Sequence, residues 1–133
     1  MKKIDLHIHT VPSHTSDSNF TFKLSKLKEY VEKMEIDCIA ITNHNLFDKN
    51  QFEERCRELS NTKIFPGIEI DLERGHILLI SENEDLEDFQ SRCIQVQQLI
   101  KTKDDCITYE QLVEIFNSLE KYLLIPHYDK KPI

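Results

Sequence analysis

The sequence predicts an α/β fold in which helices cover a mostly parallel sheet that is either open or closed into a barrel. Short apolar runs with β-strand periodicity alternate along the chain with longer segments of helical periodicity. The 133 residues fit one compact domain, and a hydrophobic fraction of 39% is sufficient for a core. Histidines and carboxylates gather at the ends of the strand-like runs, which is where parallel α/β folds build their sites.

The first half of the chain contains two predicted strands and two predicted helices. Residues 3–8 alternate between apolar and polar side chains, as a strand with one buried face does. Residues 22–34 place apolar side chains at helical spacing, which predicts an amphipathic helix. Residues 37–42 form an apolar run that is typical of a buried strand. Residues 47–59 are expected to form a second helix with a charged outer face.

The second half continues with three predicted strands and two predicted helices. Turn chemistry at Pro66-Gly67 and at residues 73–75 precedes the first two of these strands. Thr108 is expected to cap the last helix. The strands are residues 68–70, 76–80 and 122–125, and the helices are residues 85–100 and 109–119.

Composition narrows the functional classes. The formal net charge of −7 argues against a broad basic surface that grips nucleic acid unaided, although bound divalent ions would offset this charge locally. The four cysteines are scattered and form no CxxC pair, which favours free thiols over a disulfide framework. The sequence has no apolar signal core and no run of about 20 apolar residues. We therefore expect a soluble, cytoplasmic protein that does not enter a membrane.

The first candidate site is the segment Asp5-Leu6-His7-Ile8-His9-Thr10. His7 and His9 are two residues apart in a predicted strand, so both side chains project from one face and can bind a single metal ion. Asp5 is expected on the same face, where it can orient a ligand histidine. Taken alone, the histidine pair is equally consistent with the solvated face of an edge strand.

Further histidines and carboxylates lie at the ends of other predicted strands. His44 follows a buried strand, where an ordinary turn is the alternative interpretation. Glu69 is flanked by aliphatic residues, where a carboxylate is costly unless it is paired or metal-bound. The alternative is that Glu69 and Asp71 both face solvent. Taken singly, His76 and His127 are each more commonly a buried histidine that binds a backbone carbonyl. Together these positions predict one multi-metal site.

The loop after the first predicted strand offers one more ligand. Both Asp17 and His14 lie within reach of a metal held by the histidine pair, and Asp17 can instead cap the following helix. We place Asp17 ahead of His14 as the ligand.

The motifs and their order resemble the polymerase and histidinol phosphatase (PHP) domain family. The resemblance implies a partial, distorted (β/α)7 TIM-like barrel of the PHP type, with a metal site at the strand ends. It also implies hydrolysis of a phosphomonoester or phosphodiester by a metal-activated hydroxide. The matching segments, which span essentially the whole chain, are Asp5-Leu6-His7-Ile8-His9-Thr10, Ile41-Thr42-Asn43-His44-Asn45, Gly67-Ile68-Glu69-Ile70, Gly75-His76-Ile77-Leu78 and Ile125-Pro126-His127.

The resemblance further implies two or three divalent ions and their ligands. A mixture of imidazoles and carboxylates suits Zn, Mn or Fe better than Ca. The implied ligand sets are His7, His9 and Glu69 for the first ion, Glu69, His76 and His127 for the second, and His44 with Asp17 or His14 for the third.

Two features depart from the family pattern. Asn43 stands where the family usually has an aspartate, which weakens an interaction that supports a ligand. No Asp-x-His motif follows His127, so residues 1–133 are expected to form a single PHP-like domain that is truncated at its C-terminus. A truncated barrel exposes apolar strand edges, which favours a homo-oligomer.

The leading prediction is a metal-dependent phosphoric ester hydrolase. Its substrate is a phosphorylated small molecule or a nucleic acid, and a nucleotide or nucleic acid is favoured. The reason is that residues 41–48 resemble PHP domains found ahead of P-loop ATPase modules, so such a module is an expected partner or fused domain. The chain contains no GxxxxGK[ST] motif of its own. The alternative is an inactive or incomplete PHP-like domain that acts as a metal-binding or interaction module.

Overall fold

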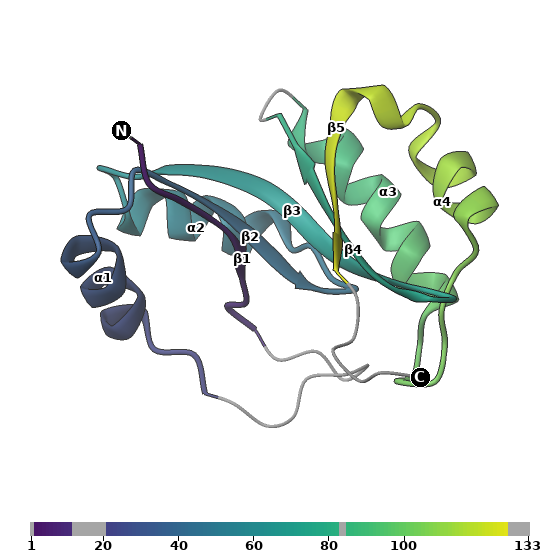
Figure 1. Ribbon diagram of the computed structural model, residues 1–133, viewed down its shortest axis with the longest axis horizontal. Helices are drawn as coiled ribbons and strands as arrows, with labels where there is room; N and C mark the ends of the chain where they lie inside the picture. Colours follow the sequence, from purple (N-terminus) through teal and green to yellow (C-terminus); the bar gives the residue numbers. More distant parts are fainter. Residues whose placement is uncertain (1, 12–20, 83–84, 128–133) are drawn as a thin grey trace.

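A computed structural model of the chain describes residues 2–11, 21–82 and 85–127, with the side chain of His127 left out. Five strands form one sheet in the order β1-β2-β3-β4-β5, and Figure 1 shows this sheet curling, with α2 and α3 against one of its faces. The architecture is therefore mixed α/β with a curled, half-barrel sheet. The strands are β1 (Ile4–Ile8), β2 (Cys38–His44), β3 (Lys63–Leu72), β4 (Gly75–Ser81) and β5 (Tyr122–His127).

Four α-helices and one short 3-10 helix connect the described strands, and three of the α-helices begin at a capping side chain. Asp48 and Asp85 each accept a hydrogen bond from a backbone N–H in the first turn of their helix. Thr108 and Gln111 form a reciprocal capping box, which confirms the predicted cap. None of the described helices is long and apolar enough to cross a membrane. The helices are α1 (Leu24–Lys33), α2 (Lys49–Glu58), α3 (Leu86–Leu99), α4 (Tyr109–Phe116) and η1 (Leu119–Lys121).

Strand direction differs from the simplest parallel sheet at one strand. β1, β2 and β3 pair in parallel, whereas β4 is antiparallel to both β3 and β5. The reason is the length of the β3–β4 connection, which consists of the two residues 73–74 between the paired Leu72 and Gly75. A two-residue loop joins only antiparallel strands, since parallel neighbours need a crossover of about a dozen residues or more.

Pro66 and Gly67 lie inside β3 and not in a turn before it. They pair with Ile41 and Thr42 of the parallel strand β2. A side chain at position 67 would meet Thr42 Cγ2 at 2.8 Å and the Leu79 carbonyl oxygen at 3.1 Å. Glycine therefore lets three strands approach closely here, which the sequence pattern alone does not distinguish from a turn.

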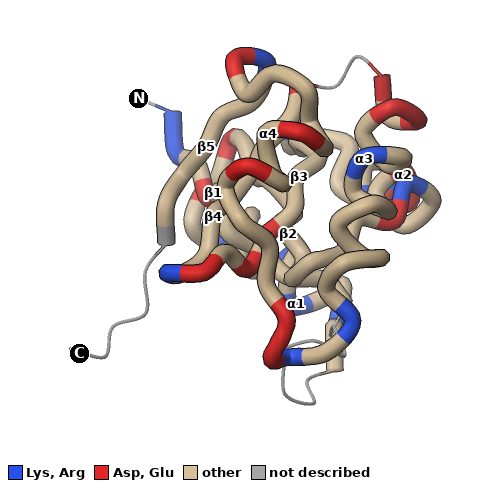
Figure 2. The backbone as a smooth tube through the Cα atoms, turned by 90° about the vertical axis from the view of Figure 1, so that its right-hand side faces the viewer, with Lys and Arg blue, Asp and Glu red and all other residues tan. Residues whose placement is uncertain are grey.

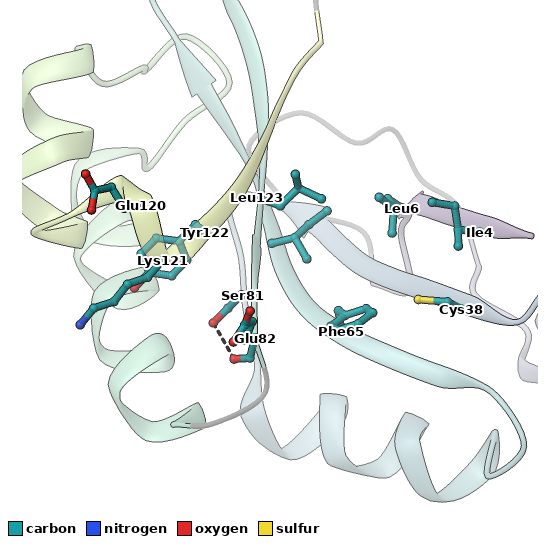
Figure 3. A pocket seen from close by; sticks show the side chains of 11 residues that line it. Ile4, Leu6, Cys38, Phe65, Ser81, Glu82, Glu120, Lys121, Tyr122 and Leu123 are labelled. Carbon is teal, nitrogen blue, oxygen red and sulfur yellow. Dashed lines mark hydrogen bonds between the residues drawn. The ribbon is translucent and has the colours of Figure 1, made fainter. Parts of the chain in front are cut away.

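The two faces of the sheet have different partners. Ile68 and Ile70 of β3 and Leu79 of β4 are fully buried in a core that includes Phe89 and Phe116 of the helices. The opposite face holds a hollow of about 490 Å³ that is lined by residues of all five strands. Figure 3 shows Phe65 of β3 and Leu123 of β5 on its walls. Alternation along β3 therefore places Glu69 and Asp71 on the face turned away from the helices.

Candidate metal centre

Glu69 of β3 is the centre of a first group of ligand-type side chains. It is 3% exposed, and its Oε1 atom lies 3.0 Å from His7 Nε2 and 2.8 Å from His9 Nε2. His44 of β2 approaches the same oxygen, with its Nδ1 atom 3.7 Å away. One buried carboxylate oxygen thus faces three imidazole rings, which is a convergence of donor atoms that suits a cation.

A β-bulge in β1 sets the direction of the two histidines. Asp5 is paired with Ile39 and Ile8 with Ile41, so three steps along β1 face two steps along β2. The extra residue changes the alternation, and Asp5 does not join the face that carries His7 and His9. The Asp5 carboxylate instead accepts hydrogen bonds from the Tyr30 hydroxyl at 2.6 Å and from the His7 backbone N–H at 3.1 Å. Asp5 therefore fixes the backbone beneath His7 and not its ring.

Asp71 of β3 is the centre of a second group. Its Oδ1 atom lies 2.6 Å from His44 Nε2 and also contacts His76 Nδ1 of β4. Asn45 donates from its side-chain amide to Asp71 Oδ2 at 3.1 Å and accepts from the Asp71 backbone N–H at 3.0 Å. Asn45 has a φ of 56°, a left-handed conformation that asparagine tolerates better than most residues. Its amide thus orients the Asp71 carboxylate toward the two imidazoles.

His44 joins the two groups. Its Nδ1 atom faces Glu69 and its Nε2 atom faces Asp71, so one ring spans both carboxylates. The imidazoles follow each other along the strand ends, with ring-centroid distances of 5.1 Å for His7–His9, 6.1 Å for His9–His44 and 5.1 Å for His44–His76. The two groups are therefore parts of one continuous site that crosses β1, β2, β3 and β4.

Both carboxylates are held in the anionic form. Burial raises the pKa of Glu69, but hydrogen bonds from His9 and His7 and the charge of His44 outweigh burial and lower the pKa from 4.5 to about 2. Burial likewise raises the pKa of Asp71, and hydrogen bonds from His44 and Asn45 outweigh it, so that pKa is also lowered. Neither carboxylate has to lose a proton before it binds a cation at neutral pH.

The donor chemistry of both groups fits a divalent transition metal. Each group offers two imidazole nitrogens and one carboxylate oxygen, and the three donor atoms of a group lie within 4.8 Å of one another. Mixed imidazole and carboxylate sets suit Zn, Mn and Fe, whereas Ca and Mg prefer oxygen ligands alone. The groups are His7, His9 and Glu69, and His44, Asp71 and His76.

A family model described as the PHP domain matches residues 5–126, which is nearly the whole chain. The chain belongs to the PHP domain family. Members of this family are typically hydrolases that bind divalent metals. No protein in the curated collection that was compared matches the chain.

The structure brings together several of the ligands inferred from the sequence for this PHP domain and adds Asp71 to them. His7, His9 and Glu69 lie together, as the first of the inferred sets has them. His44 and His76 both contact Asp71. The backbone of His127 pairs with that of His76 between β5 and β4, but its side chain lies outside the described part of the chain. Asp17 and His14 also lie outside the described residues.

Asp71 is absent from the ligands predicted from the sequence, where it entered only in the alternative that places Glu69 and Asp71 in solvent. A signal for it was present, because Asp71 follows Glu69 by two residues in one strand and must share its face. The same spacing identified His7 and His9. What the sequence did not contain was the β3–β4 pairing that places Asp71 opposite His76.

Asn43 supports the site from the buried side of β2. Its Oδ1 atom accepts from the backbone N–H groups of Thr10 at 2.7 Å and Val11 at 3.0 Å. Its amide donates to the Thr10 hydroxyl at 3.1 Å, and that hydroxyl donates to Gln51 of α2 at 2.9 Å. An aspartate at position 43 can accept from the two N–H groups but cannot donate to Thr10. Asparagine therefore suits this network, which ties the segment after His9 to the strand that carries His44.

Proposed function

We propose that this PHP domain is a metal-dependent phosphoesterase that hydrolyses a phosphomonoester or phosphodiester, with a nucleotide or nucleic acid as the favoured substrate. One observation carries the proposal. Two groups of imidazoles and carboxylates, each able to hold a metal ion, adjoin through His44 at the ends of neighbouring strands. Paired metal sites of this kind are used for in-line displacement at phosphorus.

The proposal gives each side chain a role. His7, His9 and Glu69 hold one ion, and His44, Asp71 and His76 hold a second, with Zn, Mn or Fe as the expected metal. His127 and either Asp17 or His14 remain proposed ligands of these ions or of a third. A divalent ion there supplies polarisation of the phosphoryl group and a bound water of lowered pKa.

The chain's own groups position this chemistry. The imidazoles act as ligands and not as general bases, because their ring nitrogens are directed at Glu69 and Asp71. Glu69 and Asp71 stay anionic and offset the charge of the ions, while Asn45 fixes the Asp71 carboxylate. Asn43 of β2 holds the segment after β1, and Asp5 fixes the backbone at His7, which together keep His7 and His9 beside His44.

The surroundings of the domain are part of the same proposal. The curled sheet is proposed to belong to a distorted (β/α)7 barrel, and a P-loop ATPase module is the proposed partner or fused domain. The resemblance of residues 41–48 to PHP domains found ahead of such modules supports this view. It also supports a nucleotide or nucleic-acid substrate over a small phosphorylated metabolite.

Metal analysis and a hydrolysis assay test the proposal together. The purified chain is expected to retain about two equivalents of Mn or Zn and to hydrolyse bis(p-nitrophenyl) phosphate when loaded with either metal. His9→Ala should lose both metal and activity. The control Tyr109→Ala removes a ring from a residue that is 60% exposed on α4 and should change neither. Bound metal without hydrolysis of any phosphoester would support the metal-binding module instead, and absent metal would overturn both readings.

A further inference from the structure

A pocket of about 340 Å³ borders the candidate metal centre on its exposed side. His7, Ile8 and His9 at the end of β1 form one wall. The other wall consists of residues that lie in α1 or just before it. These residues are Thr21, Phe22, Lys23, Lys26, Leu27 and Tyr30. The pocket and the first group of metal ligands therefore share two histidines.

The charge of this pocket is opposite to that of the chain. Its lining includes Lys23 and Lys26 and contains no carboxylate among the described residues. Four other hollows on the described surface are each lined by at least one Asp or Glu. The chain as a whole carries a net charge of −7, and red segments recur along the backbone in Figure 2. A positive pocket beside the metal ligands is thus a local exception.

The geometry of α1 turns both lysines to the same side. Lys23 precedes the first residue of the helix, and Lys26 follows it by three positions, which is the spacing of neighbours on a helix face. Asp5 does not line the pocket, and its carboxylate accepts hydrogen bonds from the Tyr30 hydroxyl and the His7 backbone N–H. An anion in this pocket therefore meets two ammonium groups.

Apolar side chains complete the lining. Phe22 and Leu27 face the pocket, and the Arg55 guanidinium lies 4.8 Å from the centroid of the Phe22 ring. A site that combines two cations with an aromatic ring suits a nucleotide unit, whose phosphate is anionic and whose sugar and base have apolar faces. A small phosphomonoester would use only the metal site and leave this pocket unfilled.

We propose that the pocket binds a second phosphate of a nucleic-acid strand, next to the phosphoryl group held at the metal centre, through Lys23 and Lys26. The inference rests on the proposed phosphoesterase function and narrows its substrate to an oligonucleotide or 5′-phosphorylated dinucleotide. The two lysines compensate locally for the acidity of the chain, so that a single strand is gripped at one place and not over a broad surface.

A binding measurement tests the pocket without relying on turnover. The Mn-loaded chain is titrated into a fluorescein-labelled, phosphorothioate-linked oligothymidylate, and anisotropy is recorded over a range of salt concentrations. Lys23→Gln/Lys26→Gln should weaken binding and make the slope of log K against log salt shallower by about 0.7, because loss of one single-strand phosphate contact removes about that amount. The control Lys28→Gln/Lys33→Gln removes the same charge from the same helix, outside the pocket, and should leave the slope unchanged.

A second measurement uses substrate preference. The wild-type chain is expected to show a lower KM for the 5′-phosphorylated dinucleotide pdTpdT than for dTpdT. Lys23→Gln/Lys26→Gln should raise the KM for pdTpdT toward that for dTpdT, with little change in kcat. Equal losses of oligothymidylate binding in both double variants, or no loss in either, would overturn the pocket. Selective loss of binding without hydrolysis of any substrate would support the pocket and overturn the phosphoesterase proposal, so the two failures are distinguishable.

Discussion

The two ligand groups of the centre differ in how far their histidines are exposed and in the strands that carry them. The His7–His9–Glu69 group stands at the edge of the sheet, where the histidine side chains are 34% and 23% exposed. The His44–Asp71–His76 group lies on β2, β3 and β4, and its imidazoles are 8% and 21% exposed. The edge group takes its two histidines from a bulged strand that has one neighbour in the described sheet, and its carboxylate from β3. All three side chains of the inner group come from paired inner strands. We infer that the edge group meets the substrate and exchanges metal readily, while the inner group retains its ion.

Glu69→Gln is expected to have the largest effect, because Glu69 faces His7 and His9 and also approaches His44. The amide keeps the size of the side chain but removes the charge from the edge group and weakens the inner one. Hydrolysis should fall by more than about 100-fold, since Glu69 holds the first ion and also approaches His44 of the second group, so its loss exceeds the effect of losing an outer partner. Metal content, measured by mass spectrometry, should fall below one equivalent.

Glu73→Gln is the matched control, because Glu73 is exposed in the β3–β4 turn. It should retain full activity and metal content. Wild-type activity in Glu69→Gln would mean that the two groups do not form one centre.

Asp71→Asn separates the groups. It should release the inner ion and leave the edge ion bound, so about one equivalent remains and hydrolysis falls by about 100-fold, less than in Glu69→Gln because Asp71 serves one group only. Asp104→Asn, in the exposed loop before Ile107, serves as the control. Release of both ions by Asp71→Asn would show that the groups are more interdependent than their contacts indicate.

Asn43→Ala tests the support of the edge group. The substitution leaves the buried N–H groups of Thr10 and Val11 without their acceptor, which costs about 1–3 kcal/mol of the free energy of unfolding. Denaturant titration should detect that loss, and Asn50→Ala on the exposed side of α2 should show little of it. An unchanged midpoint would mean that water replaces the amide without cost.

Of these substitutions, Tyr30→Phe should have the smallest effect on the free energy of unfolding. The hydrogen bond to Asp5 raises the pKa of Tyr30, and burial and the Asp5 charge raise it further. A raised folded pKa stabilises the protein below the ordinary pKa of 10.0, and this contribution is lost as the pH rises through the higher value. The phenolate absorbance that Tyr30→Phe removes should therefore appear above pH 10. Tyr109→Phe is the comparison, because Tyr109 is exposed. If the phenolate absorbance that is missing in Tyr30→Phe appears below pH 10 in the wild-type chain, the Asp5 contact is refuted.

The elements themselves were predictable because their signals are local. Every predicted strand and helix has a counterpart in the structure, and His7, His9 and Glu69 converge as their strand-end positions indicate. Two details depend on pairing between strands and were not predictable. The bulge in β1 separates Asp5 from the histidine face, and Asp71 meets His44 and His76. The reversed direction of β4, by contrast, follows from the short turn after β3. A single sequence does not specify register, and register decides which side chains meet.

Both carboxylates of the centre belong to β3 and are two residues apart in it. A single inserted or deleted residue in that strand ahead of Glu69 would turn both side chains to the helix-covered face at once. The turn at residues 73–74 can therefore tolerate insertions and deletions, whereas the ten residues of β3 cannot. The two carboxylates therefore depend on the same register of β3. A homologue in which a shift in β3 removes one of them from the site is expected to lack the other as well.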